Sequence, residues 1–154
     1  MSKKKKIVFG LLTGFVAIQF IQPVRNISNA VLPTDFQKIY AVPDKVVSML
    51  QISCYDCHSN NTHYPWYSFM QPGAWLMASH IKEGKADLNF SEFGAYSSRR
   101  QQSKLQAIAN SIKDKTMPIW SYTLIHKNAK LLPDDKAVLL DWIKTTKDSL
   151  SLKN

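Results

Sequence analysis

Both cysteines of this 154-residue chain fall in one pentapeptide, Cys54-Tyr55-Asp56-Cys57-His58. Two thiols one helical turn apart can add to the two vinyl groups of a haem. The histidine beside the second thiol lies at i+4 from the first, so it shares a helix face with that thiol and can ligate the iron. Both cysteines are used here, and none remains for a structural disulfide. The pattern predicts one covalent c-type haem, with His58 as the proximal iron ligand.

Two other chemistries use the same residue types. A thioredoxin-like dithiol also has the C-x-x-C spacing, but it follows a strand, whereas residues 46–51 come after Pro43-Asp44 and indicate a short helix. Zinc could bind both thiols and two of the histidines His58, His63, His80 and His126. No second C-x-x-C lies at zinc-finger distance, although His58 and His63 come close to the usual histidine spacing. Haem attachment is therefore the favoured interpretation.

The second axial position of the iron decides what the haem can do. A thioether there gives a six-coordinate electron carrier, and a vacancy allows gases or peroxide to bind. Met117 is the first candidate, because it precedes Pro118 in an irregular segment between two expected helices. The alternative for Met117 is a gap-filling role in the core. His80 is the main rival ligand, and Met70 and Met77 are weaker candidates.

Aromatic residues follow the pentapeptide closely and are numerous enough to form the wall of a flat apolar cofactor. They are Tyr64, Trp66, Tyr67, Phe69 and Trp75. Any small domain also buries aromatic residues, so core packing is the other explanation for them.

Helical periodicity and capping residues indicate a mainly α fold. We expect helices from Pro43-Asp44 into the pentapeptide, over residues 72–82 with Gly84 as a stop, from Ser97 or Ser98 to about residue 115, and from Pro133 onward. Leu105, Ile108, Ala109 and Ile112 form an apolar stripe in the third of these. We expect residues 28–41, 58–71, 87–95 and 116–132 to be irregular. The expected architecture is a small cytochrome c-like helical domain.

The N-terminus carries a targeting pattern. Lys3–Lys6 precedes a mostly apolar run that continues to Val24. This pattern predicts an uncleaved membrane anchor in preference to a cleaved signal, with the remainder of the chain exported. The expected organisation is an anchor over 1–24, an approach segment over 25–40, a haem domain over 41–146 and a tail over 147–154.

Composition limits the choice of partners. The formal net charge is +9, but four of the twenty basic residues are the Lys3–Lys6 block. The remaining excess is modest and favours acidic redox proteins or an anionic lipid surface. No arginine-rich motif points to nucleic acid.

Residues 40–145 resemble the bacterial haem-binding domain family of exported single-haem c-type proteins. The segments that carry the resemblance are Cys54–Thr62, Tyr64–Ser68, Gly84, Leu88–Ser91, Met117-Pro118, Tyr122, His126, Ala129 and Leu131. The end of the chain, from Met117-Pro118 to Ile143, is also similar to the end of class I cytochromes c. The resemblance implies covalent haem c, with His58 as proximal and Met117 as distal ligand.

The sequence therefore favours an exported, membrane-tethered protein that transfers single electrons between redox partners and is not an enzyme. The rival hypothesis is a haem enzyme or a gas or redox sensor with an open distal site, in which Met117 is only a core residue and His80 lies near the open face.

Overall fold

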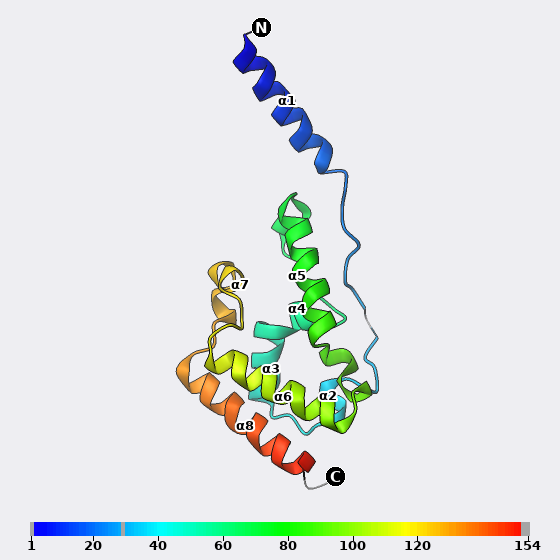
Figure 1. Cartoon of the computed structure of the whole chain (residues 1–154), viewed down its shortest axis with the longest axis vertical. Helices are drawn as coiled ribbons and strands as arrows, with labels where there is room; N and C mark the ends of the chain where they lie inside the picture. Colours follow the sequence, from blue (N-terminus) through cyan, green and yellow to red (C-terminus); the bar gives the residue numbers. More distant parts are fainter. Residues whose placement is uncertain (1, 29, 152–154) are drawn as a thin grey trace.

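The computed structural model describes residues 2–28 and 30–151, and every regular element in these ranges is helical (Figure 1). The α-helices are α1 (Lys3–Ile18), α2 (Phe36–Ile39), α3 (Asp44–Leu50), α4 (Asp56–His58), α5 (Gly73–Asp87), α6 (Ser98–Lys113), α7 (Trp120–Ile125) and α8 (Pro133–Ser151). A π-helical segment, η1 (Gln51–Tyr55), joins α3 to α4. Three short 3₁₀ helices are η2 (Trp66–Phe69), η3 (Phe90–Ala95) and η4 (Lys127–Ala129). The expected mainly α class is confirmed.

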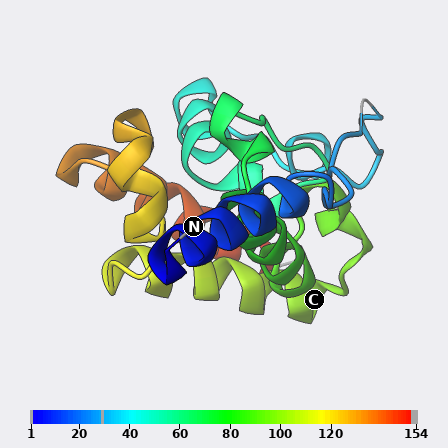
Figure 2. The same ribbon diagram turned by 90° about the horizontal axis from the view of Figure 1, so that it is seen from above.

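Helix α1 projects from one end of the molecule, beyond the start of α5 (Figures 1 and 2), and none of its side chains is buried. In the described part of the chain, no helix combines the length and the apolar character needed to cross a membrane. The expected N-terminal membrane anchor is therefore not supported.

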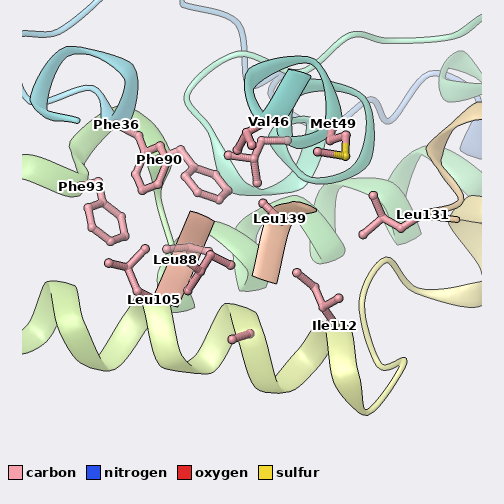
Figure 3. Packing of buried hydrophobic residues seen from close by; sticks show 13 residues of the cluster. Phe36, Val46, Met49, Leu88, Phe90, Phe93, Leu105, Ile112, Leu131 and Leu139 are labelled. Atoms are coloured by element: carbon pink, nitrogen blue, oxygen red, sulfur yellow. The ribbon is translucent and has the colours of Figure 1, made fainter. Parts of the chain in front are cut away.

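The core lies at the other end of the molecule, where α6 and α8 run side by side beneath α3. Its members come from five elements, α2, α3, η3, α6 and α8, and from the segments next to them (Figure 3). They are Phe36, Val46, Met49, Leu50, Leu88, Phe90, Phe93, Leu105, Ala109, Ile112, Leu131, Leu139 and Ile143. This core holds α3 against α8, and with it the Cys54–His58 pentapeptide, here called the attachment segment.

Helices α6 and α8 follow the sequence signals closely. The Ser97 hydroxyl caps α6 by accepting a hydrogen bond from the backbone N–H of Arg100 at 3.4 Å. Its buried stripe includes Leu105 and Ile112, as the periodicity predicts. Helix α8 begins at Pro133 with two aspartates in its first turn, where carboxylates interact favourably with the helix dipole.

Two segments expected to be irregular contribute the largest buried side chains. Phe36 comes from α2, and Phe90 and Phe93 come from η3; all three are completely buried. The Phe36 ring meets the other two edge-to-face, with centroids 5.1 and 4.9 Å away. Elements of four to six residues are too short to show a helical period, which is why their positions were not predicted.

The attachment pentapeptide continues directly from α3, as expected. The chain stays helical from Asp44 through η1 and α4 to His58. Helix α5 continues past Gly84 to Asp87, so the expected stop at Gly84 is wrong. The expected loop over 116–132 contains α7 and η4.

Candidate functional site

A cleft of about 370 Å³ lies between the attachment segment, α5 and the connection from α6 to α7. All five predicted site residues line it: Cys54, Cys57, His58, His80 and Met117. Ser53, Asp56, Glu83, Gly84, Asp87, Pro118, Ile119 and Tyr122 complete the lining. The volume lies within the range of roughly 300–1,000 Å³ that is usual for cofactor sites. The fold therefore brings residues separated by more than sixty positions to one cleft.

A smaller cavity of about 80 Å³ extends the cleft toward the core. It shares Cys54, His58 and Met117 with the larger cleft. Its other walls are largely apolar and include Leu88, Phe90, Ala107, Ile108, Ile112 and Leu131. A cofactor with a flat apolar body finds hydrophobic side chains on this side.

The hydrogen bonds of His58 fix which ring nitrogen carries the proton. Its Nδ1 lies 2.9 Å from the carbonyl oxygen of Gly84 and 3.1 Å from that of Leu88. Carbonyl oxygens only accept, so Nδ1 must be the N–H donor. The lone pair of the neutral ring is then on Nε2, the nitrogen left for a metal. The imidazole is oriented and protonated as an iron ligand requires.

Gly84 allows α5 to approach the attachment segment closely. A Cβ atom at this position would lie 2.8 Å from the carbonyl oxygen of Cys57 and 3.3 Å from its carbonyl carbon. Any side chain would therefore push α5 and α4 apart. The same residue supplies a carbonyl to His58, so this close contact and the orientation of the imidazole depend on each other.

The two thiols are neutral in the unmodified chain. Burial raises the pKa of Cys54 to about 12, with a smaller contribution from Cys57. Burial and the nearby charge of Asp56 raise the pKa of Cys57 to about 11. Reactive dithiols instead have lowered pKa values, because the thiolate is the nucleophile. The site does not have the electrostatics of a thioredoxin-like centre.

Met117 reaches the cleft because α6 ends abruptly. Lys115 adopts a left-handed conformation with φ of 59°. The backbone N–H of Thr116 donates to the carbonyl of Ser111 at 3.0 Å, and that of Lys115 donates to Ile112 at 3.4 Å. These two bonds form a Schellman motif, which turns the chain away from the helix axis. Met117 follows two residues later, with 40% of its surface exposed.

Asp56 connects the attachment segment to α7. One of its carboxylate oxygens accepts a 2.7 Å hydrogen bond from the Tyr122 hydroxyl, and the other accepts one from the backbone N–H of His63 at 2.9 Å. Burial and the Asp56 carboxylate raise the pKa of Tyr122, which keeps the hydroxyl protonated as the donor. Because Tyr122 follows Met117 by five residues, this bond closes one side of the cleft.

Asn26 connects the segment after α1 to the same region. Its side-chain NH₂ donates to the carbonyl of Ser59 at 2.8 Å and to the Thr62 hydroxyl at 2.9 Å. Its carbonyl oxygen accepts from the Lys85 ammonium at 2.6 Å. Sequence reasoning missed Asn26, Asp56 and Tyr122 as structural supports of the site, because no motif marks hydrogen bonds between distant segments.

The aromatic residues expected to surround the cofactor lie elsewhere. None of Tyr64, Trp66, Tyr67, Phe69 and Trp75 lines the cleft or its extension. Residues 66–69 form η2, which packs on α5. The Trp75 indole N–H donates to the carbonyl of Ile21 at 3.0 Å, on the side of α1. Proximity in sequence was a poor guide, because the chain turns away after the pentapeptide.

The other expected ligand sets have less support. Among the described residues, no three His, Cys, Asp or Glu side chains converge as a metal site would require. His126 stacks on Tyr122 with ring centroids 4.3 Å apart, and its Nε2 is hydrogen-bonded to the Tyr67 hydroxyl. Met70 and Met77 do not line the cleft.

Comparison with known proteins gives one match. The model of a family described as the haem-binding domain matches residues 13–145, which include all five predicted site residues. No curated protein and no solved structure matches the chain. The family match covers most of the chain and coincides with the cleft that holds a cysteine pair and an imidazole with a free Nε2. This chain belongs to the haem-binding domain family, and its cofactor is a haem.

Proposed function

We propose that the chain binds one haem c covalently and carries single electrons between redox proteins. Cys54 and Cys57 form the two thioether bonds, His58 is the proximal iron ligand, and Met117 is the distal ligand. The observation that carries the proposal is the single cleft lined by all four residues. Haem supplies an iron centre that changes its charge by one electron.

The attachment residues have the chemistry that this proposal needs. The thiols are neutral and line the same cleft, where a vinyl group could be held against them. The His58 ring is held by two backbone carbonyls, which keep Nε2 available for a metal. Both acceptors belong to the backbone, so the orientation depends on how closely α5 approaches the pentapeptide.

Met117 is favoured over His80 because of the element each comes from. His58 turns its Nδ1 toward the carbonyl of Gly84 in α5. His80 lies on the same helix, one turn before Gly84. The ligand opposite a proximal histidine comes more readily from a separate segment, and Met117 belongs to the connection between α6 and α7. A thioether ligand raises the reduction potential and favours electron transfer over catalysis.

The proposed location is outside the cytoplasmic membrane. Lys3–Lys6 followed by the apolar α1 has the charge and hydropathy order of an export signal. Attachment of c-type haem on the far side of the bacterial inner membrane fits this order, as the resemblance implies. The redox partners would then be exported or membrane proteins.

Absorption spectroscopy of the oxidised and reduced protein tests the ligand assignment. The protein is expressed together with haem-attachment machinery, beside Met117→Ala and the matched control Met70→Ala. Met70 is also exposed, at 49%, but does not line the cleft. We expect covalent low-spin haem in the wild type, with a sulfur-to-ferric-iron band that disappears only in Met117→Ala.

A second function has one specific observation in its favour. His80 and Glu83 line the cleft beside the proximal histidine, and such titratable groups could assist chemistry at an open iron site. A haem enzyme or sensor would give a high-spin spectrum that is insensitive to Met117→Ala. A bis-histidine carrier would instead respond to His80→Ala. Loss of covalent haem in Cys54→Ala or Cys57→Ala tests attachment separately, by haem staining of a denaturing gel.

A further inference from the structure

We propose that one end of the molecule docks on an anionic lipid surface. This end, here called the tip, comprises residues 66–76: η2, the turn after it and the first turn of α5. No residue of the tip lines the cleft or its extension, and the proposal goes beyond the proposed electron transfer, which does not require it.

The tip exposes several large apolar side chains to water. Trp66 is 75% exposed and Leu76 is 59% exposed. Phe69 and Met70, between them in sequence, are also exposed. Neighbouring exposed apolar groups mark sites of protein or membrane interaction. A tryptophan among them is typical of membrane interfaces, where its ring lies at the headgroup level.

Hydrogen bonds join the tip to the C-terminal end of α1. The Gln19 side chain accepts from the backbone N–H of Gln71 at 2.9 Å. The Gln71 side chain in turn donates to the carbonyl of Ile21 at 2.8 Å. The side chains of Phe20 and Ile21 are exposed, as are the apolar residues of α1 from Ile7 to Val16. The apolar surface of the tip is therefore continuous with that of α1, and both lie at the same end of the molecule (Figures 1 and 2).

The charged side chains at this end are basic, which favours an anionic partner. None of the chain's eleven acidic residues lies within residues 1–34 or 57–82, the ranges that contain α1 and the tip. The Arg25 guanidinium lies 3.8 Å from the centroid of the Phe69 ring. Arg25, Lys82 and Lys85 line a hollow of about 320 Å³ beside the tip. Aromatic and aliphatic side chains next to the Arg25 cation, with no carboxylate among the residues of the tip, match the acyl and phosphate layers of an anionic bilayer.

Vesicle binding of matched double variants tests the proposal. The full, haem-loaded chain is titrated with phosphatidylglycerol–phosphatidylcholine vesicles and with phosphatidylcholine vesicles, and binding is measured by sedimentation. Trp66→Ser with Leu76→Ser changes the tip. Trp120→Ser with Leu124→Ser is the control, because these α7 residues are 76% and 56% exposed. Both variants carry an unchanged α1.

We expect the tip variant to bind anionic vesicles roughly tenfold or more weakly than wild type, since two large apolar side chains no longer leave water. The control should stay within about twofold. Hydrogen exchange provides a second measurement. It reports on the tip directly, even if α1 binds vesicles so tightly that sedimentation does not separate the variants. Anionic vesicles should slow amide exchange over residues 66–76 in the wild type and not in the tip variant.

Three results would overturn the proposal: equal loss of binding in the two variants, no loss in either, or vesicle binding without slower exchange over residues 66–76. Stronger binding to phosphatidylcholine than to the anionic vesicles would contradict the charge argument. The haem spectrum, recorded on every variant, reports separately on the proposed cofactor function and on folding.

Discussion

Gly84 is the residue on which the geometry of the cleft most depends, although it has no side chain. A glycine inside a helix normally costs about 1 kcal/mol relative to alanine. Here it permits contact with the Cys57 carbonyl, and its own carbonyl accepts from His58. The unfavourable helix propensity is offset by the close approach of two helices.

We expect Gly84→Ala to lower the free energy of unfolding by about 1–3 kcal/mol, because the methyl group would overlap the Cys57 carbonyl. It should also reduce the yield of covalent haem, since α5 would carry the carbonyl away from His58. Urea denaturation and haem staining measure the two effects.

Gly73→Ala is the matched control on the same helix. A Cβ at Gly73 would lie 3.9 Å from its nearest neighbour, which is an ordinary contact. The control should be neutral or stabilising, as alanine usually is in a helix. An equally stabilising Gly84→Ala would show that the close contact with Cys57 does not limit the structure.

The residues of the site differed in how far the sequence could predict them. Cys54, Cys57 and His58 carry their chemistry in their spacing, and they line one cleft as that spacing requires. Gly84 was taken for a helix stop, because its purpose is a contact with a residue twenty-seven positions away. Tyr122 was singled out only by the family resemblance, and its role was not predicted, since its hydroxyl matters only once α7 lies beside Asp56.

At the scale of elements, the end of α6 determines where Met117 lies. The Schellman motif requires a left-handed residue, and Lys115 fills that position. A non-glycine residue pays roughly 1–2 kcal/mol for this conformation. The helix therefore ends at a fixed residue, and a strained lysine comes just before the segment that carries Met117.

We expect Lys115→Gly to raise the free energy of unfolding by up to about 1 kcal/mol, because glycine adopts this conformation without steric cost. Thermal or urea unfolding of the haem-loaded protein measures the change. The haem absorption spectrum of Lys115→Gly should match that of the wild type, because the turn that positions Met117 is kept.

Lys113→Gly is the control for Lys115→Gly. It shows whether glycine stabilises only at the left-handed position or at any position near the end of α6. Lys113 is the last residue of α6 and has ordinary helical geometry. Glycine there should destabilise by up to about 1 kcal/mol. If both substitutions destabilised, the conformation of Lys115 would not be a source of strain.

The lengths of elements explain which parts of the fold were predictable. Helices α6 and α8 are long enough to show a period. Ser97 caps the first and Pro133 begins the second, so their starts agree with the sequence signals. Helix α2 and η3 have too few residues for a period, yet they bury Phe36 and Phe90. Helix α5 continues past Gly84 because its packing against α4 outweighs the propensity of one glycine.

At the scale of the whole molecule, an aromatic cluster joins the segment after α1 to the core. Tyr40 lies 5.2 Å from the ring of Phe36 and 6.5 Å from that of Trp142 in α8. Its hydroxyl donates to the Gln101 side chain in α6 at 2.6 Å. The approach segment is thus part of the folded body, and global unfolding is what exposes Tyr40 to water.

This burial predicts how stability changes at alkaline pH. Desolvation raises the pKa of Tyr40 from 10.0 to about 12. Between these values the unfolded chain has lost the phenol proton and the folded chain still holds it, so rising pH favours unfolding. The stabilisation is complete below pH 10 and is lost as the pH approaches 12.

Comparison of wild type with Tyr40→Phe isolates this contribution. The free energy of unfolding of each protein is measured as a function of pH. The variant also loses the hydrogen bond to Gln101 and should be less stable at neutral pH by about 1 kcal/mol. Lysines and other tyrosines titrate in both proteins, so their contribution cancels in the difference. We expect the difference in stability between the two proteins to shrink from pH 10 to 12, because only the wild type loses the Tyr40 contribution. Parallel curves over that interval would mean that Tyr40 releases its proton equally easily in the folded and unfolded chain.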